Sequence, residues 1–292
     1  MSIGNLKLAI VLCALAPVAT LSAESIDETR DIAADARVSV ENIVGDIEIQ
    51  AWDRNEVHLT GRLGNSVEEL EIIETSTGLE ITVINRDERN IDETILKLRV
   101  PATVSLAASA VSADIEISGM DNDKLTGSSV SGDVVVRATS EWVSLESVSG
   151  NVEFSGQTAR ISAESVSGDI ELSGISGRVD ATTVSGDMEV AAGLVDSGSF
   201  ETVSGDIQAE MELSDSGKLR AESMSGDVTV TLPDSQAGLF KAQTFSGRIS
   251  TDFGSVSKPK HGPGSHLKYA AGNGGAEIRV ESFSGNIKLQ GE

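Results

Sequence analysis

The sequence contains almost no cysteine and few aromatic residues. Cys13 is the one cysteine among 292 residues, and Phe, Trp and Tyr together make up 3% of the chain. Once an N-terminal leader containing Cys13 is removed, the chain has no thiol for a disulfide, a thiolate zinc site or a cysteine nucleophile. The scarcity of aromatic side chains, together with 29 glycines, favours thin stacked layers of aliphatic residues over one thick globular core.

Basic residues are also scarce. Lys and Arg number 22 against 46 Asp and Glu, which gives a formal net charge of −24 at pH 7. A charge of this size repels nucleic acid and anionic membrane surfaces, so we expect neither as a partner. With 39% hydrophobic residues the chain is nevertheless too apolar for a disordered acidic tail. We therefore expect a folded protein.

No apolar run in the sequence reaches the length of a bilayer-spanning helix. The best candidate covers residues 8–18 and follows Lys7. A spanning helix needs about 20 apolar residues, whereas a basic residue, a short apolar run and a small-residue end at Ala23 are typical of a secretory signal peptide. We predict a signal peptide at residues 1–23, export to the periplasm or cell surface of a bacterium, and no membrane span in the mature chain.

The sequence is rich in a short repeat. Copies of a V-S-G-D-I unit follow one another at intervals of 18, 18, 18, 19, 21, 21 and 38 residues. We interpret the glycine of each copy as a structural turn position, and the eight glycines are Gly132, Gly150, Gly168, Gly186, Gly205, Gly226, Gly247 and Gly285. Because the last interval is about two periods long, we expect one degenerate rung, or a loop in its place, before Gly285.

Apolar and polar residues alternate within each unit. Val166, Gly168 and Ile170 are expected to point inward, and Ser167 and Asp169 outward, which is the period of a half-buried strand. Strands this short leave no room for a helical crossover, so we expect each to pair in parallel with its equivalent one turn away, at about 4.8 Å. The sequence therefore predicts an all-β fold, a parallel β-helix (β-solenoid) with 18–21 residues per coil.

The two ends of the chain are less regular. Residues 24–104 contain strand-like alternations but no series of V-S-G-D units. We expect them to form an N-terminal β-rich cap, because an open solenoid end exposes unpaired backbone groups. Residues 105–292 are expected to form the solenoid. Within them, residues 255–275 include Pro259, Pro263 and several glycines, which predicts a surface loop.

Stacking the unit places carboxylates in columns. One column holds Asp169, Asp187, Asp206 and Asp227, and another holds Glu146, Glu164, Glu201 and Glu222. Like charges at this spacing repel by roughly 1 kcal/mol per pair in water. One interpretation is that each Asp accepts hydrogen bonds from its own turn, as Asp and Asn often do. The alternative is Ca²⁺ bound between rungs, although the repeat lacks the G-G-x-G-x-D spacing of calcium-binding β-rolls. We expect no cofactor, with a calcium-stabilised scaffold as the alternative.

The sequence contains none of the common catalytic motifs. The three histidines, His58, His261 and His266, form no H-E-x-x-H pattern, and neither G-x-S-x-G nor G-x-x-x-x-G-K-[ST] occurs. Carboxylates at every rung single out no acid pair. We therefore expect no catalytic residues. A β-helix enzyme acting on polysaccharide is the alternative, because paired acids about 5 to 9.5 Å apart suit glycoside hydrolysis.

Three sequence features together resemble a known family. They are V-E-N-I-V-G-D-I-E-I at residues 40–49, L-K-L-R-V-P at residues 96–101, and the serial V-S-G-D-I units. They are similar to the bacterial putative-adhesin family, a domain of unknown function with β-strand repeats, over nearly all of the mature chain. The resemblance implies right-handed winding of the β-helix, an exported or envelope protein, and no catalytic residues. Arg248 and Asn286 depart from the usual Asp of the unit.

One segment of this acidic chain gathers basic side chains. Its residues, all within the predicted loop, are Lys258, Lys260, His261, His266, Lys268 and Tyr269. We expect a solvated loop. The alternative is that this cluster contacts an acidic partner, such as the Asp/Glu face of another copy or an anionic glycan, because long loops on rigid scaffolds are suited to binding. The sequence thus predicts an exported, non-catalytic structural or adhesin-like binding module of the bacterial cell envelope. Its expected partner is an envelope protein or glycan, and self-association is a further expectation.

Overall fold

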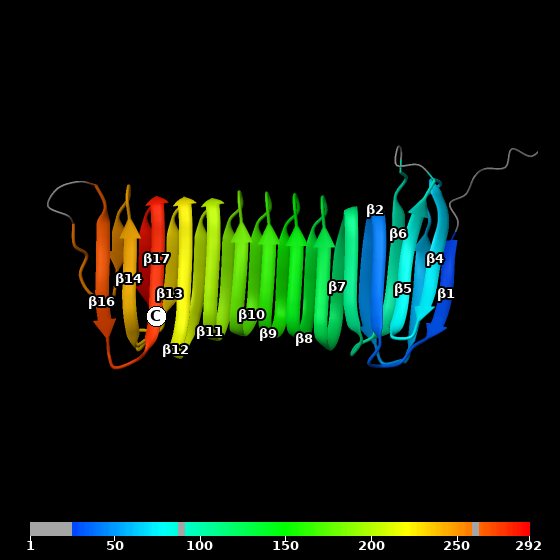
Figure 1. Ribbon diagram of the computed structural model, residues 1–292, viewed down its shortest axis with the longest axis horizontal. Coiled ribbons are helices and arrows are strands. Elements are labelled where there is room, and N and C mark those ends of the chain that lie inside the picture. Colours follow the sequence, from blue (N-terminus) through cyan, green and yellow to red (C-terminus); the bar gives the residue numbers. More distant parts are fainter. Residues whose placement is uncertain (1–24, 87–90, 259–262) are drawn as a thin grey trace, which may run out of the picture.

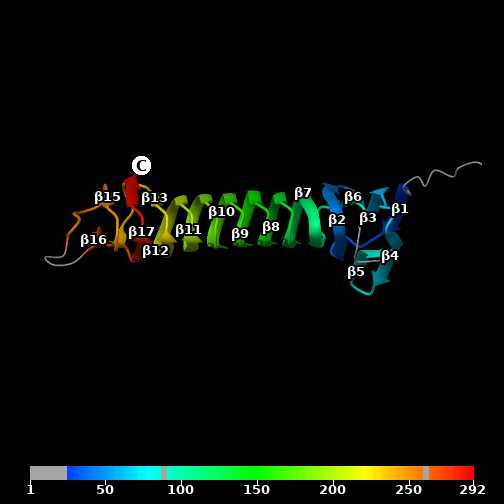
Figure 2. The same ribbon diagram turned by 90° about the horizontal axis from the view of Figure 1, so that it is seen from above.

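The computed structural model of the protein describes residues 25–86, 91–258 and 263–292, and the regular elements in these ranges are all β-strands. Eighteen strands form one mostly parallel sheet, which winds into a row of narrow coils (Figure 1, Figure 2). In chain order they are β1 (Ser25–Asp31), β2 (Arg37–Trp52), β3 (Glu56–Arg62), β4 (Val67–Thr75), β5 (Gly78–Asn85), β6 (Thr94–Pro101), β7 (Ser105–Ser129), β8 (Val134–Ser147), β9 (Val152–Ser165), β10 (Ile170–Thr183), β11 (Met188–Ser204), β12 (Ile207–Ser225), β13 (Val228–Leu232), β14 (Gly238–Thr244), β15 (Ile249–Thr251), β16 (Ser265–Ala271), β17 (Ala276–Ser284) and β18 (Ile287–Gly291). Within the described ranges, no helix has the length and hydropathy needed to traverse a bilayer.

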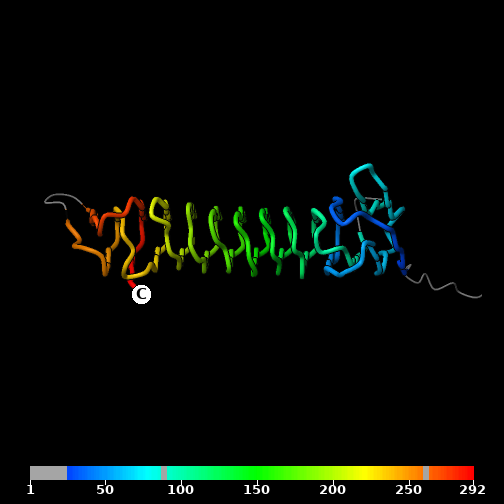
Figure 3. Tube along the Cα trace, turned by 90° about the horizontal axis from the view of Figure 1, so that it is seen from below, coloured from blue at the N-terminus to red at the C-terminus, as the bar shows by residue number. Residues whose placement is uncertain are grey.

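The central strands stack in register, one repeat apart. Val134 of β8 pairs with Val152 of β9, which pairs with Ile170 of β10, which pairs with Met188 of β11. All these pairings are parallel, and Figure 3 shows the coils as a row of similar loops. The predicted all-β fold with parallel stacking of equivalent strands is therefore confirmed.

The core is a column of aliphatic side chains, one layer per rung. In β9, Val152, Phe154, Ile161 and Ala163 are each exposed by 1% or less. The inward phase changes after Thr158, where the strand bends from one face of the coil to the other. Because rungs repeat at about 4.8 Å, each buried side chain lies against its equivalents in the neighbouring rungs. Aliphatic residues therefore fill most of this thin core, and Phe side chains such as Phe154 and Phe200 fill it at a few rungs.

The turn that follows each strand differs from the sequence prediction at one position. The alternation predicts an inward Val166, but this side chain is 43% exposed, so the prediction is wrong. Ser165 takes the buried position, where its hydroxyl donates to the Gly150 carbonyl oxygen at 3.3 Å and accepts from the Gly168 amide at 2.9 Å. Because these hydrogen bonds close the corner around Ser165, the chain leaves the strand there and carries Val166 into solvent.

Adjacent rungs approach each other most closely at the turn glycines. A methyl group on Gly168 would lie 2.0 Å from the carbonyl oxygen of Gly150, and the corresponding distance is 1.9–2.1 Å at all eight turn glycines. None of the eight has a left-handed backbone conformation, which instead occurs at corner glycines such as Gly174, with a φ of +80°. Glycine is required in the turn because no side chain fits between two rungs.

The Asp of each unit links its rung to the next one. Asp169 Oδ1 accepts a hydrogen bond from the Asp187 amide at 2.9 Å, and Asp187 Oδ1 accepts one from the Asp206 amide at 2.8 Å. The same contact recurs at every step from Asp114 to Arg248, at 2.7–3.2 Å. The prediction that each Asp accepts from its own turn is therefore wrong, because the donor belongs to the neighbouring rung.

Regular stacking begins earlier in the chain than the sequence suggested. β2 pairs in parallel with β7 from Arg37 to Gln50, with Val38 opposite Leu106 and Ile47 opposite Ile115. On its other side β2 pairs in parallel with β5 and β6. Antiparallel pairs formed by β1, β3 and β4 follow beyond them. Part of the region 24–104 is therefore a solenoid rung, and the antiparallel strands lie at the N-terminal end.

The rungs at the C-terminal end do not stack in chain order. β17 pairs in parallel with β12 on one side and with β14 on the other, so the final segment lies between two earlier ones (Figure 1). β18 lies likewise between β13 and β15. In the described part of the 38-residue interval before Gly285, the antiparallel β16 and its flanking segments take the place of one regular rung, which agrees with the predicted loop rather than with a degenerate rung. β14 and β15 form the outermost parallel rung. The chain then returns as β17 and β18, which lie between that rung and the rung of β12 and β13.

The segment predicted as a surface loop contains a strand. β16 pairs antiparallel with β14, with Leu267 opposite Ala242. The loop prediction for residues 255–275 is therefore wrong at Ser265–Ala271. The glycines and prolines around this short strand are typical of a loop, so the sequence pattern does not indicate a strand there. β16 pairs with backbone groups that β14 would otherwise leave free at the edge of the sheet.

Replacing Gly168 by alanine tests the close approach of the rungs. We expect Gly168→Ala to lower the free energy of unfolding by about 1–3 kcal/mol, the usual cost of overpacking a tight site. Gly193→Ala is the matched control, because the nearest atom to its added methyl would be the Ile175 carbonyl oxygen at 3.7 Å. The control should change stability by less than about 0.5 kcal/mol. Equal destabilisation of both variants in denaturant titrations would contradict this account of the glycine column.

Two substitutions of Asp169 separate its charge from its acceptor oxygen. Asp169→Ala removes the acceptor of the Asp187 amide and should lower the free energy of unfolding by about 0.5–1.5 kcal/mol, the net value of one hydrogen bond. Asp169→Asn keeps that oxygen, as Asn151 does in the neighbouring rung, and should change stability little. Thermal unfolding of both variants measures the difference. If Asn proves as harmful as Ala, the negative charge rather than the hydrogen bond is what matters.

Candidate binding surface

Each turn of the solenoid exposes one apolar side chain. This residue opens the V-S-G-D unit, or its V-S-A-D variant, and is 43–60% exposed in all nine copies. In spatial order the nine are Val111, Val130, Val148, Val166, Val184, Val203, Met224, Phe283 and Phe245. We call this row the apolar ridge. Its turns are the thin loops beyond the arrowheads of the central strands in Figure 1. At about 4.8 Å per rung the ridge spans about 38 Å.

Sequence reasoning missed the apolar ridge, although a signal was present. The residue before the exposed one is small and polar in each central unit, as with Ser165 before Val166 and Thr183 before Val184. A buried hydroxyl can serve both as donor and as acceptor at a tight corner. The inward phase therefore ends at this hydroxyl, and the next apolar residue is directed outward.

Acidic columns flank the apolar ridge on both sides. The Asp residues that link the rungs lie three positions after each ridge residue. The Glu column lies two positions before it and includes Glu201, Glu222 and Glu281. Arg220 Nη2 lies 2.6 Å from Glu222 Oε2, and Arg279 Nη2 lies 2.9 Å from Glu281 Oε1. The hydrogen bond with Glu222, and then its charge, raises the pKa of Arg220. These exposed ion pairs add little stability, and the border of the ridge stays net negative.

The apolar ridge adjoins a groove near the C-terminal end of the solenoid. This groove has a volume of about 650 Å³, and the ridge residues that line it are Val184, Val203, Met224, Phe283 and Phe245. The rings of Phe245 and Phe283 stack with centroids 4.9 Å apart and planes 6° apart. Met224 and Phe283 are the most exposed members of the ridge, at 60% and 57%. We call this site the C-terminal groove.

Two buried polar atoms beside the C-terminal groove have no hydrogen-bond partner among the described residues. They are Thr202 Oγ1 and Glu222 Oε1, and both residues line the groove. Arg279 Nε lies 4.0 Å from Glu222 Oε1, which is too far for a hydrogen bond. The hydroxyl equivalent to that of Thr202 in the next rung, on Ser223, donates to the Gly205 carbonyl oxygen at 3.3 Å. Both atoms are buried, so neither adds to the exposed lining of the groove.

The structure brings the predicted basic cluster together only in part. Lys260 and His261 lie outside the described residues. Lys258 is exposed, and His266, Lys268 and Tyr269 belong to β16. The partner-binding role of this cluster stays a prediction.

Within β16 the three cluster residues do not share one face. Neighbouring residues of a strand point to opposite faces, so His266 and Lys268 lie on the outer face, opposite Gln243 and Lys241 of β14. Tyr269 lies opposite the buried Phe240, with ring centroids 6.2 Å apart. Lys241 also reaches Glu277, and this hydrogen bond, followed by the charge of Lys241, lowers the pKa of the Glu277 carboxyl.

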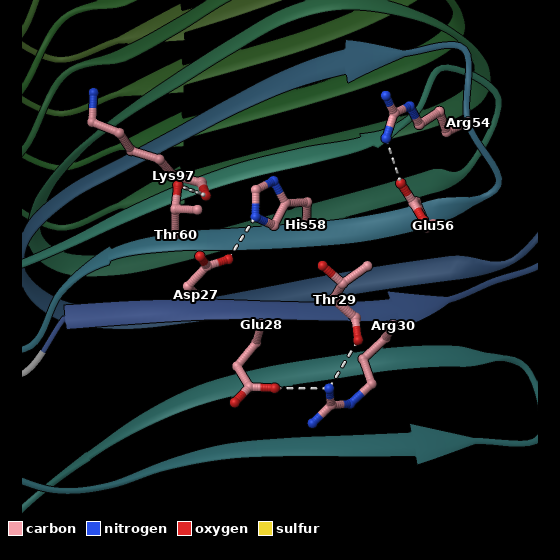
Figure 4. Close-up of polar contacts among 9 residues, drawn as sticks. All are labelled: Asp27, Glu28, Thr29, Arg30, Arg54, Glu56, His58, Thr60 and Lys97. Carbon is pink, nitrogen blue, oxygen red and sulfur yellow. Dashed lines mark hydrogen bonds and ion pairs between the residues drawn. The ribbon is translucent and has the colours of Figure 1, made fainter.

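A second polar cluster lies on the N-terminal strands (Figure 4). His58 Nε2 lies 2.9 Å from Asp27 Oδ1, and the Trp52 ring stacks on His58 with centroids 6.1 Å apart. The hydroxyl of Thr60 donates to the Lys97 carbonyl oxygen at 3.3 Å rather than to the imidazole. The imidazole of His58 and the carboxylate of Asp27 therefore form a hydrogen bond at the surface.

Metal binding finds no support in the described ranges. They contain no group of three or more His, Cys, Asp or Glu side chains arranged to hold a metal ion. One oxygen of each linking Asp already accepts a backbone amide, as Asp206 Oδ1 does from Asp227 at 2.7 Å. The carboxylates proposed as calcium ligands thus accept hydrogen bonds from backbone amides.

Comparison with known proteins places this chain in a family. Among crystal structures, the chain is similar to a putative adhesin from Bacteroides fragilis, at 13% sequence identity and a TM-score of 0.48, and the match covers 92% of this chain and 98% of that one. It is also similar to a putative adhesin from Parabacteroides distasonis, at 12% identity and a TM-score of 0.40, with 91% of this chain and 97% of that one covered. A putative lipid binding protein from the same species matches at 15% identity and a TM-score of 0.31, with 90% of this chain and 96% of that one covered. No curated protein matches the sequence significantly. The model of the Toastrack DUF4097 family matches residues 36–290. The family resemblance carried by the V-S-G-D-I units is thereby confirmed, and the chain belongs to the Toastrack DUF4097 family.

Proposed function

We propose that this protein is an exported, non-catalytic binding module of the bacterial cell envelope and that the apolar ridge is its binding surface. The observation that carries the proposal is the row of nine apolar side chains exposed along one edge of the solenoid. Contiguous exposed apolar surface on a folded protein marks a site of interaction.

The fold itself does not require apolar residues at the ridge positions. A side chain that is 43% exposed, such as Val166, contributes little to the core, and the residue beside it, Ser167, is polar. A β-branched residue at this place has a slight preference for extended backbone. That preference does not account for Met224 or Phe283, which are the most exposed members of the ridge. Binding gives a reason for apolar side chains at these positions.

The rigidity of the scaffold supports the same proposal. Backbone pairing, the buried hydroxyls and the linking Asp residues all connect one turn to the next, so the ridge residues are held at a fixed spacing. A partner that docks on a preorganised surface loses less binding free energy to the ordering of side chains and loops. The long edge of the solenoid is therefore well suited to recognition.

The proposal also includes export, right-handed winding and non-catalytic action, each of which has its own support. Export rests on Lys7, the apolar run at residues 8–18 and the small residue Ala23, all outside the described ranges. Right-handed winding rests on the general preference of parallel strand connections, about 98% of which are right-handed. Non-catalytic action rests on the Asp oxygens engaged with backbone amides and on the hydroxyl of Thr60, which donates to the main chain.

A single experiment on cells and isolated envelopes tests this function. We expect the full chain to be processed to a mature form that begins at Glu24 and is found in the periplasmic or surface fraction. The mature protein should cosediment with isolated envelopes and release no sugar from them. The double variant Met224→Ser/Phe283→Ser should weaken this binding about tenfold or more, because central apolar side chains dominate binding free energy.

The control variant is Ser225→Ala, which changes an exposed polar residue of the same turn. It should bind like the unaltered protein, and all variants should unfold at similar temperatures, since exposed substitutions change stability by less than about 0.5 kcal/mol. An unprocessed chain in the cytosol, sugar release by the purified protein, or equal binding by the double variant would each refute the proposed function.

A further inference from the structure

The C-terminal groove runs along the apolar ridge and has one apolar side. That side is the part of the ridge from Val184 to Phe245. The opposite side holds Glu201, Glu222 and Glu281, whereas Asp187, Asp206 and Asp227 lie beyond the ridge, three positions after its residues. Among the nearby cations, Arg220 and Arg279 pair with the Glu column, Lys241 pairs with Glu277, and Arg248 ends the Asp column. A complementary partner therefore presents an apolar stripe with positive charge beside it, mainly toward the Asp column.

This charge distribution argues against two other occupants. A second copy of the chain would bring its own acidic columns against these ones, and each copy carries a formal charge of −24. Like charges in a partly desolvated interface repel more strongly than in water. An anionic membrane surface is repelled for the same reason.

The backbone of the turns favours a helical partner over an extended one. An added strand needs free N–H and C=O groups, but the turn groups here already pair between rungs. Ser204 N donates to the Val184 carbonyl oxygen and Ser246 N to that of Phe283, each at 2.9 Å. An α-helix satisfies its own backbone and presents an apolar stripe with flanking polar residues. Five rungs cover about 19 Å, the length of about 13 helical residues.

We infer that the C-terminal groove binds a cationic amphipathic α-helix of a partner protein. The apolar face of the helix packs on Met224, Phe283 and Phe245, and its Lys and Arg side chains lie along the acidic columns. This inference rests on the proposed binding function and names the chemistry of the partner.

A designed peptide provides the probe. It is a fluorescent peptide of about 14 residues, built from Leu and Lys in an amphipathic helical pattern, and its binding to the purified mature protein is followed by anisotropy. Two control peptides accompany it: one with the same composition in scrambled order, and one with Glu in place of Lys. We expect the amphipathic Lys peptide to bind at least about tenfold more tightly than either control, and to lose affinity as salt is added.

Two pairs of variants locate the peptide on the protein. Met224→Ser/Phe283→Ser removes part of the apolar side of the groove and should weaken binding about tenfold or more, whereas Ile73→Ser/Leu194→Ser, which changes exposed apolar residues outside the ridge, should not. Asp206→Asn/Asp227→Asn removes two charges while keeping the oxygens that link the rungs, so folding is preserved. It should weaken binding several-fold, and Asp114→Asn/Asp133→Asn, at the far end of the same column, should not.

The outcomes separate this inference from the proposed function. The inference is overturned if the scrambled or Glu peptide binds as tightly as the Lys peptide, or if the groove variants bind like their control variants. It is also overturned if the mature protein self-associates, or floats with anionic vesicles, in a way that Met224→Ser/Phe283→Ser abolishes. If envelope binding depends on the ridge but the Lys peptide does not bind, the helix inference fails and the envelope function stands. If the peptide binds the groove but the envelopes are not bound, the proposed envelope function fails and the helix inference stands.

Discussion

The contact of each turn with the turn above it is the constraint on which the structure depends. At Gly168 the chain passes so close to the Gly150 carbonyl oxygen that a methyl group would lie 2.0 Å from it. This approach sets the rung spacing at the corner and dictates what the neighbouring residues do. Ser165 fits beneath the corner because its hydroxyl hydrogen-bonds in both directions. Asp169 follows it and accepts the amide of the next rung. One tight corner therefore explains the small polar residue, the Gly and the Asp of the repeat.

The same corner produces the surface of the protein. Closing the turn around a buried hydroxyl directs the next residue outward, and repetition aligns these residues into the apolar ridge. The Asp links and the Glu column then border the ridge with negative charge because they occupy fixed positions on either side of it. Structure and surface are thus two consequences of one turn. In a solenoid, any side chain at a repeated position becomes a continuous line along the molecule.

Much of the architecture could be predicted from the sequence, because periodicity specifies parallel stacking of like on like. The details that could not be predicted depend on the corner and on the order of the rungs. Val166 was expected inward because the alternation was extended through a turn that breaks it. The position of β17 between β12 and β14 was not predictable, because the V-S-G units of Met224, Phe245 and Phe283 are nearly interchangeable neighbours. β16 was not predicted because glycines and prolines, which are typical of loops, surround it. The backbone amide that donates to each Asp was not predicted because it belongs to the neighbouring rung.

Cysteine cross-linking between rungs is the most direct test of this account. In a chain expressed from Glu24 onward, which has no cysteine of its own, one double variant carries Ser225→Cys and Ser284→Cys, at directly paired positions. A second carries Ser225→Cys and Ser246→Cys, two rungs and about 9.6 Å apart, which exceeds the reach of about 7 Å between the Cα atoms of a disulfide. The account predicts that mild oxidation closes the first disulfide and not the second. A disulfide in the second variant, with none in the first, would contradict the stacking of turn on turn that underlies both the fold and its surface.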